Sequence, residues 1–161
     1  MAADTPSPAV VLTPEQLLKH WQGHRGLTRR VIEAFPEDAL FNFTLGGMRP
    51  FSALAWEFLR MAVPTVRGVV TGEWSGGPDA EPTTKADILR LWDEDTAELE
   101  RLWPKIAPHR FQESELAFGQ WEGPVYNLIL YVVDNEIHHR GQGYVYLRAL
   151  GIEPPAFYDR Q

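Results

Sequence analysis

The residues best suited to chemistry lie in one predicted helix near the end of the chain. Asn135 and His139 are four positions apart, so both project from the same face of a helix. At helical spacing they share a band with Val125, Leu128, Val132, Gly143, Tyr146 and Leu150, which we expect to face the core. Two donor atoms on one helical face suit a single metal ion. Glu136, on the flank of the band, forms Glu-x-x-His with His139, a spacing that helical bundles use for metals bridged by carboxylates.

A second predicted helix supplies a carboxylate. Glu57 lies among apolar residues at helical spacing, and an unpaired buried charge is costly, so Glu57 needs a partner. Glu57, Asn135 and His139 together predict a metal site with three protein ligands and open positions, as in catalytic sites. Glu136 is an alternative to Asn135. On the first predicted helix, His20 and His24 are also four apart, and His24 is a further alternative ligand.

The same residues also have a structural interpretation without a metal. A buried histidine is more often a hydrogen-bonded core residue than a ligand. Glu57 would be satisfied equally by an ion pair with Arg140, with Arg49 or with a histidine of the first helix. Both interpretations stay open from the sequence alone.

Four amphipathic segments must position these residues. Helical spacing and capping signals predict helices at about 14–34, 50–71, 85–103 and 124–150. Glycine and proline mark a long loop at 72–83, and the stretch 107–123 is irregular and aromatic. No convincing run of alternating strand residues is present. The pattern predicts an all-α four-helix bundle over residues 13–161, after a mobile N-terminal arm at residues 1–12.

Composition narrows the class of partner. The chain has 161 residues and a net charge of -7, which predicts one domain and disfavours nucleic acid or anionic membranes as main partners. It has no cysteine, so a thiol nucleophile must come from solution. With no signal peptide and no apolar run long enough to span a bilayer, we expect a cytoplasmic protein.

The segment at 134–144 (DNEIHHRGQGY), followed by LRALGIEPP at 147–155, resembles the closing signature of the DinB family of damage-inducible, metal-dependent proteins. The segment MRPF at 48–51 resembles the opening of that family's second helix. With the helix lengths and order, the resemblance covers nearly the whole chain after the arm. It implies a four-helix bundle with a crossover connection, and it implies a homodimer.

The family's typical site has three histidines, one on the second helix and a His-x-x-x-His pair on the fourth. Only His139 matches residue for residue, because Glu57 and Asn135 fall at the other two positions. The implied cofactor is a divalent metal such as Zn, Ni or Mn. An amide is a poor ligand for zinc or nickel, so the site has changed its metal preference, recruited Glu136 or His24, or decayed.

Characterised relatives include transferases that use thiols such as bacillithiol, mycothiol or glutathione. The resemblance therefore implies a metal-dependent thiol S-transferase of detoxification or stress response, whose partners are a small-molecule thiol and an electrophile. In this scheme Arg140 or Tyr144 recognises acidic groups on the thiol. Two alternatives are a bundle that binds a ligand or partner without turnover, its metal site weakened, and a metal-dependent hydrolase.

Overall fold

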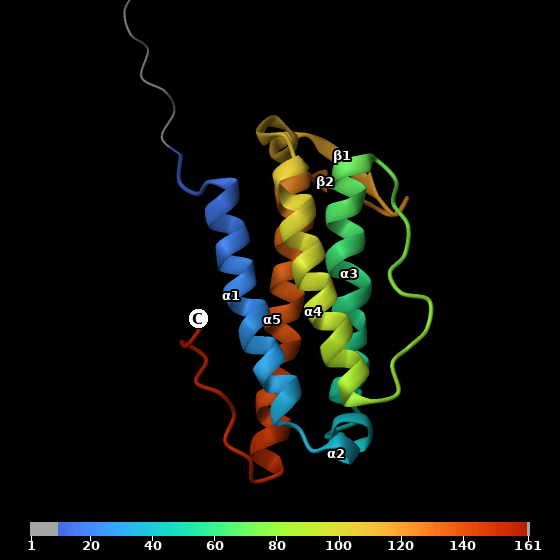
Figure 1. Ribbon diagram of the computed structural model, residues 1–161, viewed down its shortest axis with the longest axis vertical. Coiled ribbons are helices and arrows are strands. Elements are labelled where there is room, and N and C mark those ends of the chain that lie inside the picture. Colours follow the sequence, from blue (N-terminus) through green and yellow to red (C-terminus); the bar gives the residue numbers. More distant parts are fainter. Residues whose placement is uncertain (1–9, 161) are drawn as a thin grey trace, which may run out of the picture.

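Residues 10–160 are described here in a computed structural model, and they are mostly helical (Figure 1). The elements in chain order are α1 (Pro14–Ala34), α2 (Glu37–Asn42), α3 (Phe51–Thr71), α4 (Lys85–Leu102), η1 (Trp103–Lys105), η2 (Pro108–Gln112), β1 (Ser114–Ala117), β2 (Trp121–Pro124) and α5 (Val125–Ala149). The predicted arm at 1–12 falls largely on residues 1–9, which lie outside the described residues. Residues 10–12 are exposed and not helical.

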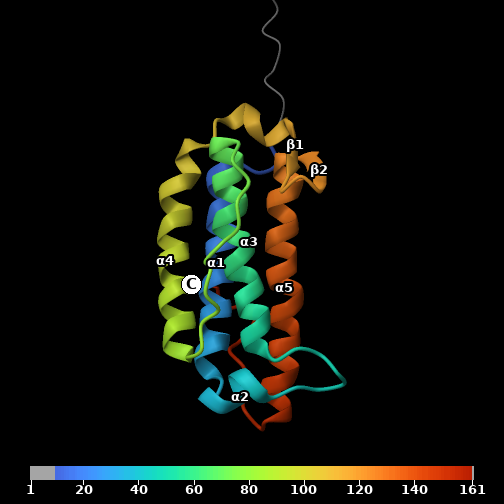
Figure 2. The same cartoon turned by 90° about the vertical axis from the view of Figure 1, so that its right-hand side faces the viewer.

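The four long helices lie side by side, as the two views show (Figures 1 and 2). Helices α3 and α1 each pack mainly against α4 and α5. Helices α1 and α5 run in one direction, and α3 and α4 run in the other (Figure 1). Because α3 and α4 are parallel, the connection at 72–84 returns along the length of the helices before α4 begins. None of the helices in residues 10–160 combines the length and the apolar character needed to cross a bilayer.

Local sequence signals set the ends of the helices. The Thr13 hydroxyl accepts a hydrogen bond from the backbone N–H of Gln16, and the Gln16 side chain accepts one from the backbone N–H of Thr13. This reciprocal capping box starts α1 at Pro14. Thr84 caps α4 with its hydroxyl, which accepts from the backbone N–H of Asp87, without the reciprocal bond of a capping box. After α5, Gly151 adopts the left-handed conformation at φ 76°, which stops the helix where the sequence predicted.

The connections between the long helices contain smaller elements, of which α2 was not predicted, whereas the stretch 107–123 was expected to hold a short extra turn or strand. The connection between the first two long helices contains the six-residue helix α2, whose Leu40 is fully buried. The irregular stretch at 107–123 contains η2 and an antiparallel hairpin in which Ser114 pairs with Pro124 and Ala117 with Trp121. The hairpin contacts α3 and α5, so it covers the end of the helices next to the start of α5 (Figure 2).

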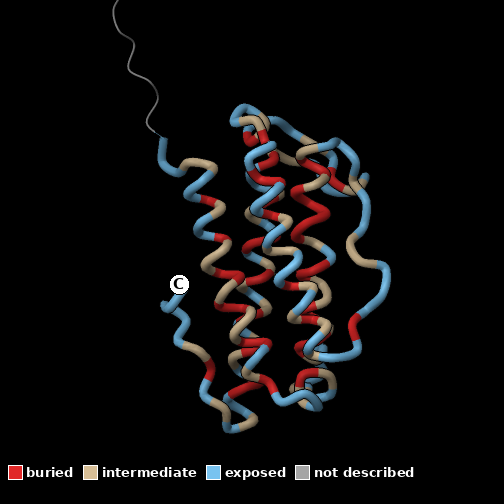
Figure 3. Tube along the Cα trace, in the orientation of Figure 1, coloured by how far each residue is buried: buried red, intermediate tan, exposed pale blue. Residues whose placement is uncertain are grey.

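Buried positions recur along each of the long helices (Figure 3), and the buried apolar residues form two clusters, one toward each end of the helices. One cluster surrounds Trp21 and Ile129 near the hairpin, and the other surrounds Phe58 and Tyr146 near α2. Buried polar side chains lie between the two clusters along α1 and α5; they are His24, Arg25, Thr28, Glu136 and Arg140. The interior is therefore divided by a polar layer rather than being apolar throughout.

Gly143 sets the distance between α5 and the start of α3. A Cβ atom at residue 143 would lie 2.5 Å from a ring carbon of Phe51. The Phe51 ring is buried and stacks on Phe35, with ring centres 5.0 Å apart. Gly141, two residues earlier on the same helix, would place its Cβ in open space. Of the two glycines, only Gly143 is required by close packing.

This difference predicts opposite effects of two alanine substitutions. Gly143→Ala should lower the free energy of unfolding by about 1–3 kcal/mol, because the Phe51 ring must move within a packed core. Gly141→Ala should raise it by about 0.5–1 kcal/mol through helix propensity alone. Urea denaturation of the two variants measures both changes, and a shift of the same sign and size in the two would contradict the packing role of Gly143.

Candidate metal centre and ligand groove

Glu57, Asn135 and His139 come together where α3 meets α5. The Glu57 Oε1 atom lies 3.5 Å from His139 Nε2, and the Asn135 amide donates a hydrogen bond of 3.1 Å to the same oxygen. The side chains of Glu57 and His139 are 28% and 16% exposed. The site is thus set at the edge of the packed interior, where a small molecule can reach it.

Arg49 neutralises the other carboxylate oxygen of Glu57. Its Nη1 atom lies 2.6 Å from Glu57 Oε2. Burial alone would raise the pKa of Glu57, but the hydrogen bonds from Arg49 and Asn135 outweigh it and place that pKa below its usual value. Glu57 is therefore a carboxylate anion, paired through Oε2, with Oε1 turned toward His139.

The His139 imidazole is held neutral and oriented. Burial lowers the pKa of His139 by more than the nearby Glu57 carboxylate raises it. The Gln142 side-chain amide lies 3.0 Å from Nδ1, and the Phe58 ring lies 6.2 Å away, centre to centre. With this amide nitrogen donating to Nδ1, the neutral ring carries its proton on Nε2, toward Glu57. Turning the Gln142 amide over would let Nδ1–H donate to its oxygen and free the Nε2 lone pair for a metal.

The donor atoms fit one weakly held divalent cation. Two ligands about 2.1 Å from a tetrahedral ion are roughly 3.4 Å apart, close to the separation of Glu57 Oε1 and His139 Nε2. The Asn135 carboxamide is the third donor, and turning it over would direct its oxygen to the same point. Residues 10–160 contain no cluster of three or more His, Cys, Asp or Glu side chains, and Arg49 competes for the Glu57 charge. Affinity should therefore be modest.

The buried face of α5 is rotated from the predicted band. Glu136 and Arg140 are 2% and 6% exposed and lie at its centre, whereas Asn135 and His139 are only half-buried. Leu128 and Leu150, predicted to face inward, are also only partly buried. The prediction placed Asn135 and His139 in the band and Glu136 on its flank, and it went wrong because α5 directs Glu136 and Arg140 toward α1.

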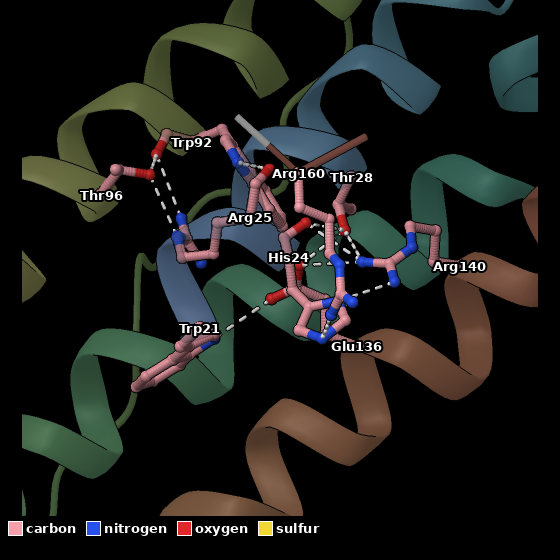
Figure 4. Close-up of polar contacts among 9 residues, drawn as sticks. All are labelled: Trp21, His24, Arg25, Thr28, Trp92, Thr96, Glu136, Arg140 and Arg160. Carbon is pink, nitrogen blue, oxygen red and sulfur yellow. Dashed lines mark hydrogen bonds and ion pairs between the residues drawn. The ribbon is translucent and has the colours of Figure 1, made fainter. Parts of the chain in front are cut away.

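Glu136, the alternative ligand, belongs to the buried polar layer and not to the candidate site (Figure 4). Its carboxylate accepts hydrogen bonds from the Thr28 hydroxyl at 2.5 Å and from the Trp21 indole at 3.3 Å. Arg140 Nη1 lies 3.9 Å from the same carboxylate. Because these partners come from α1 and from the next turn of α5, Glu136 is committed to helix packing.

His24, the other alternative ligand, is enclosed by two guanidinium groups (Figure 4). Its Nδ1 atom is 2.9 Å from Arg140, and its Nε2 atom is 3.0 Å from Arg160 in the C-terminal segment. That segment passes so close to α1 that a Cβ on Gly23 would lie 2.9 Å from the Arg160 carbonyl oxygen. Neither ring nitrogen of His24 is available to a metal.

Arg140 and Tyr144, predicted to recognise substrate, also lie away from the candidate site. Arg140 is buried and donates to the His24 carbonyl and to the Thr28 hydroxyl, both at 3.1 Å. The Tyr144 hydroxyl is buried without a hydrogen-bond partner among the described residues, and burial raises its pKa. The structure therefore gives neither side chain a route to a ligand at Glu57.

Arg25, a fully buried arginine of the polar layer, was not among the predicted site residues. Arg25 donates to the Thr96 hydroxyl at 3.0 Å and to the Trp92 carbonyl at 3.1 Å (Figure 4). Its guanidinium carbon lies 4.1 Å from the centre of the Trp92 ring. The one available signal was its position on the apolar stripe of α1, between Trp21 and Thr28, where a charged residue is unexpected.

A groove of about 850 Å³ opens beside Glu57. It lies between α3, the hairpin and α5, and Glu57 forms part of its wall. Asn135 and His139, which contact Glu57, are not among the lining residues. Its aromatic lining residues are Trp56, Phe118, Trp121 and Tyr131, and its charged lining residues are Arg49, Glu57, Arg60 and Glu122. Glu57 thus links the candidate metal centre to a space large enough for an organic molecule.

The environment of His24 predicts a pH-dependent stability. Burial, with Arg140, His20 and Arg160, lowers the pKa of His24 from 6.5 to about 4. The unfolded chain therefore binds this proton first, and stability should fall as the pH drops from 6.5 to 4, by about 3 kcal/mol from this residue. Denaturation of the wild type and of His24→Gln across this range should give a flatter profile for the variant.

His138→Gln, a substitution at an exposed histidine, serves as the control and should keep the wild-type slope. A His24→Gln profile as steep as that of the wild type would show that His24 is not the buried neutral group described above.

Comparison with known proteins identifies the class. The DinB family profile matches residues 71–161, and the chain belongs to the DinB family. A DinB-like protein from Bacillus cereus ATCC 10987 has a similar structure, with a TM-score of 0.74 at 20% identity over 92% of this chain and 100% of that one. A DinB-like protein from Bacillus subtilis gives a TM-score of 0.73 at 19% identity, over 91% and 99%. No curated protein is significantly similar.

Proposed function

We propose that this DinB-family protein is a metal-dependent enzyme that joins a low-molecular-weight thiol to an electrophile held in the groove. One observation carries the proposal. Glu57 lies 3.5 Å from His139 and also forms part of the wall of the 850 Å³ groove, so a cation on Glu57 Oε1 would adjoin a bound organic molecule. Glu57 and His139 would hold the metal, and Asn135 would complete the ligand set.

A divalent cation held by Glu57 and His139 would supply Lewis-acid activation, which lowers the pKa of a thiol. The chain itself prepares the site. Arg49 keeps Glu57 ionised through Oε2, and Gln142 orients the His139 ring through Nδ1. The aromatic groove walls would shield the electrophile from water. The absence of cysteine from the sequence is consistent with a nucleophile that arrives from solution.

The family resemblance is also the basis for the proposed topology, oligomeric state and cellular role. The side-by-side packing of α1, α3, α4 and α5, with the long return at 72–84, supports a four-helix bundle with a crossover connection. A homodimer and a cytoplasmic role in detoxification or stress response are part of the same proposal. The net charge of -7 supports small molecules rather than nucleic acid as partners.

A second candidate is a bundle that binds a small ligand without turnover. The Arg49 guanidinium, 2.6 Å from Glu57, already supplies a positive charge next to the candidate site, and this favours a metal-free protein. Glu57 then needs no ion, and the groove alone would carry the function. The two candidates differ in whether a divalent metal binds at all.

Metal binding by protein purified without a histidine tag separates them. Zn, Ni or Mn at about 100 times the dissociation constant should stabilise the fold by about 2.7 kcal/mol, measured as a rise in Tm. Glu57→Gln and His139→Ala should abolish the rise, because each removes a strong donor atom. His138→Ala, at the exposed neighbouring position, should retain it. No bound ion and no rise in Tm with any of the three metals would defeat the enzymatic proposal.

Thiol consumption then distinguishes the chemistry. A transferase consumes an added thiol, such as glutathione, one for each electrophile converted, and Glu57→Gln should lower that rate at least tenfold through the loss of the metal. Turnover of the electrophile without thiol would instead indicate a metal-dependent hydrolase.

A further inference from the structure

Arg60 is an unpaired cation on the wall of the groove. It lies on α3, one turn beyond Trp56 and Glu57, and its guanidinium carbon is 5.8 Å from the centre of the Trp56 ring. The side chain is exposed and lines the groove, and it forms no ion pair with any residue in 10–160. Arg49, the other cation of the groove, is already paired with Glu57. A guanidinium over an aromatic ring keeps its donors free for a carboxylate.

The rest of the groove wall is rich in aromatic side chains, which suit a planar apolar ligand. Four aromatic rings line it, and those of Trp121 and Tyr131 are 57% and 62% exposed. Phe118, at the hairpin turn, has a φ of 53°, a conformation that is strained for a bulky residue. Its ring is held edge-on between Trp74, at 5.3 Å, and Trp121, at 6.1 Å. Large exposed rings gathered around one groove are typical of a ligand site.

The charged residues of the groove determine where an anionic group of a ligand would bind. Of its two acidic residues, Glu57 is neutralised by Arg49, and Glu122 lies exposed on β2. Glu57 and Arg60 are three residues apart on α3, so a molecule bound at Arg60 reaches toward Glu57 and the candidate metal centre. The anionic end of a ligand would lie at Arg60, and its apolar body would lie along the aromatic wall.

We infer that the groove binds a planar, hydrophobic organic acid, whose carboxylate pairs with Arg60 while its ring system lies along the aromatic wall of Trp56, Trp121 and Tyr131. This inference rests on the proposed function, because it takes the groove as the place where the electrophile binds. It replaces Arg140 and Tyr144, which the sequence suggested for recognition of acidic groups, with a residue that faces the groove.

Binding of 2-naphthoate, followed by calorimetry in the presence of a chelator and without thiol, tests the inference. Arg60→Gln should weaken binding about tenfold or more, because a charge-assisted bidentate contact is lost. The same variant should bind the neutral analogue 2-naphthylmethanol as the wild type does. Arg148→Gln is the matched control, since Arg148 is also exposed, forms no ion pair within residues 10–160 and lies outside the groove. Trp56→Leu should weaken the binding of both ligands.

Three results would overturn the inference. They are no binding of 2-naphthoate, equal affinity in Arg60→Gln and the wild type, and tighter binding of 2-naphthylmethylamine than of the acid. The last would assign the groove to cations through Glu122. The calorimetry contains a chelator and no metal, so it tests the groove independently of the metal experiment. Failure of metal binding would therefore not explain a loss of naphthoate binding, and failure of naphthoate binding would not contradict a rise in Tm with metal.

Discussion

The Glu57 carboxylate, held between α3 and α5, is the constraint on which the candidate site depends. A partly buried charge must be compensated, and here the compensation comes from three directions. Arg49 pairs with one oxygen, while Asn135 and His139 of α5 face the other. The close approach of the two helices, made possible where Gly143 meets Phe51, brings α5 within reach of Glu57. The geometry of the candidate site therefore depends on the close packing of α3 against α5.

Helix α5 carries two pairs of polar residues, and each residue of one pair is next in sequence to a residue of the other pair. Glu136 and Arg140 face α1, are almost fully buried, and are satisfied by hydrogen bonds within the polar layer. Asn135 and His139 face α3, remain half-buried, and lie beside a groove. The first pair is buried and holds helices together. In the second, within residues 10–160, His139 Nε2 faces Glu57 Oε1, and that oxygen also accepts a hydrogen bond from the Asn135 amide. These partly exposed donor atoms are what a ligand site requires.

Much of this arrangement was predictable from the sequence, because it follows from local rules. Thr13 and Thr84 mark helix starts through capping, and Gly151 marks a helix end through its left-handed conformation. The meeting of Glu57 with His139 was predicted from helical periodicity and the family resemblance. What failed was the finer rotation of α5, because periodicity places apolar residues inward and does not anticipate that Arg25 and Glu136 are buried together. The groove residues Arg60, Phe118 and Trp121 come from separate elements, and only the tertiary structure shows that they share a wall.

Anomalous diffraction from crystals of the untagged protein soaked in zinc or manganese would test the central claim most directly. We expect a single strong peak within bonding distance of both Glu57 Oε1 and His139 Nε2, with the Asn135 carboxamide oxygen turned toward it. A map with no peak at this position, and with Glu57 held only by Arg49 and Asn135, would contradict it.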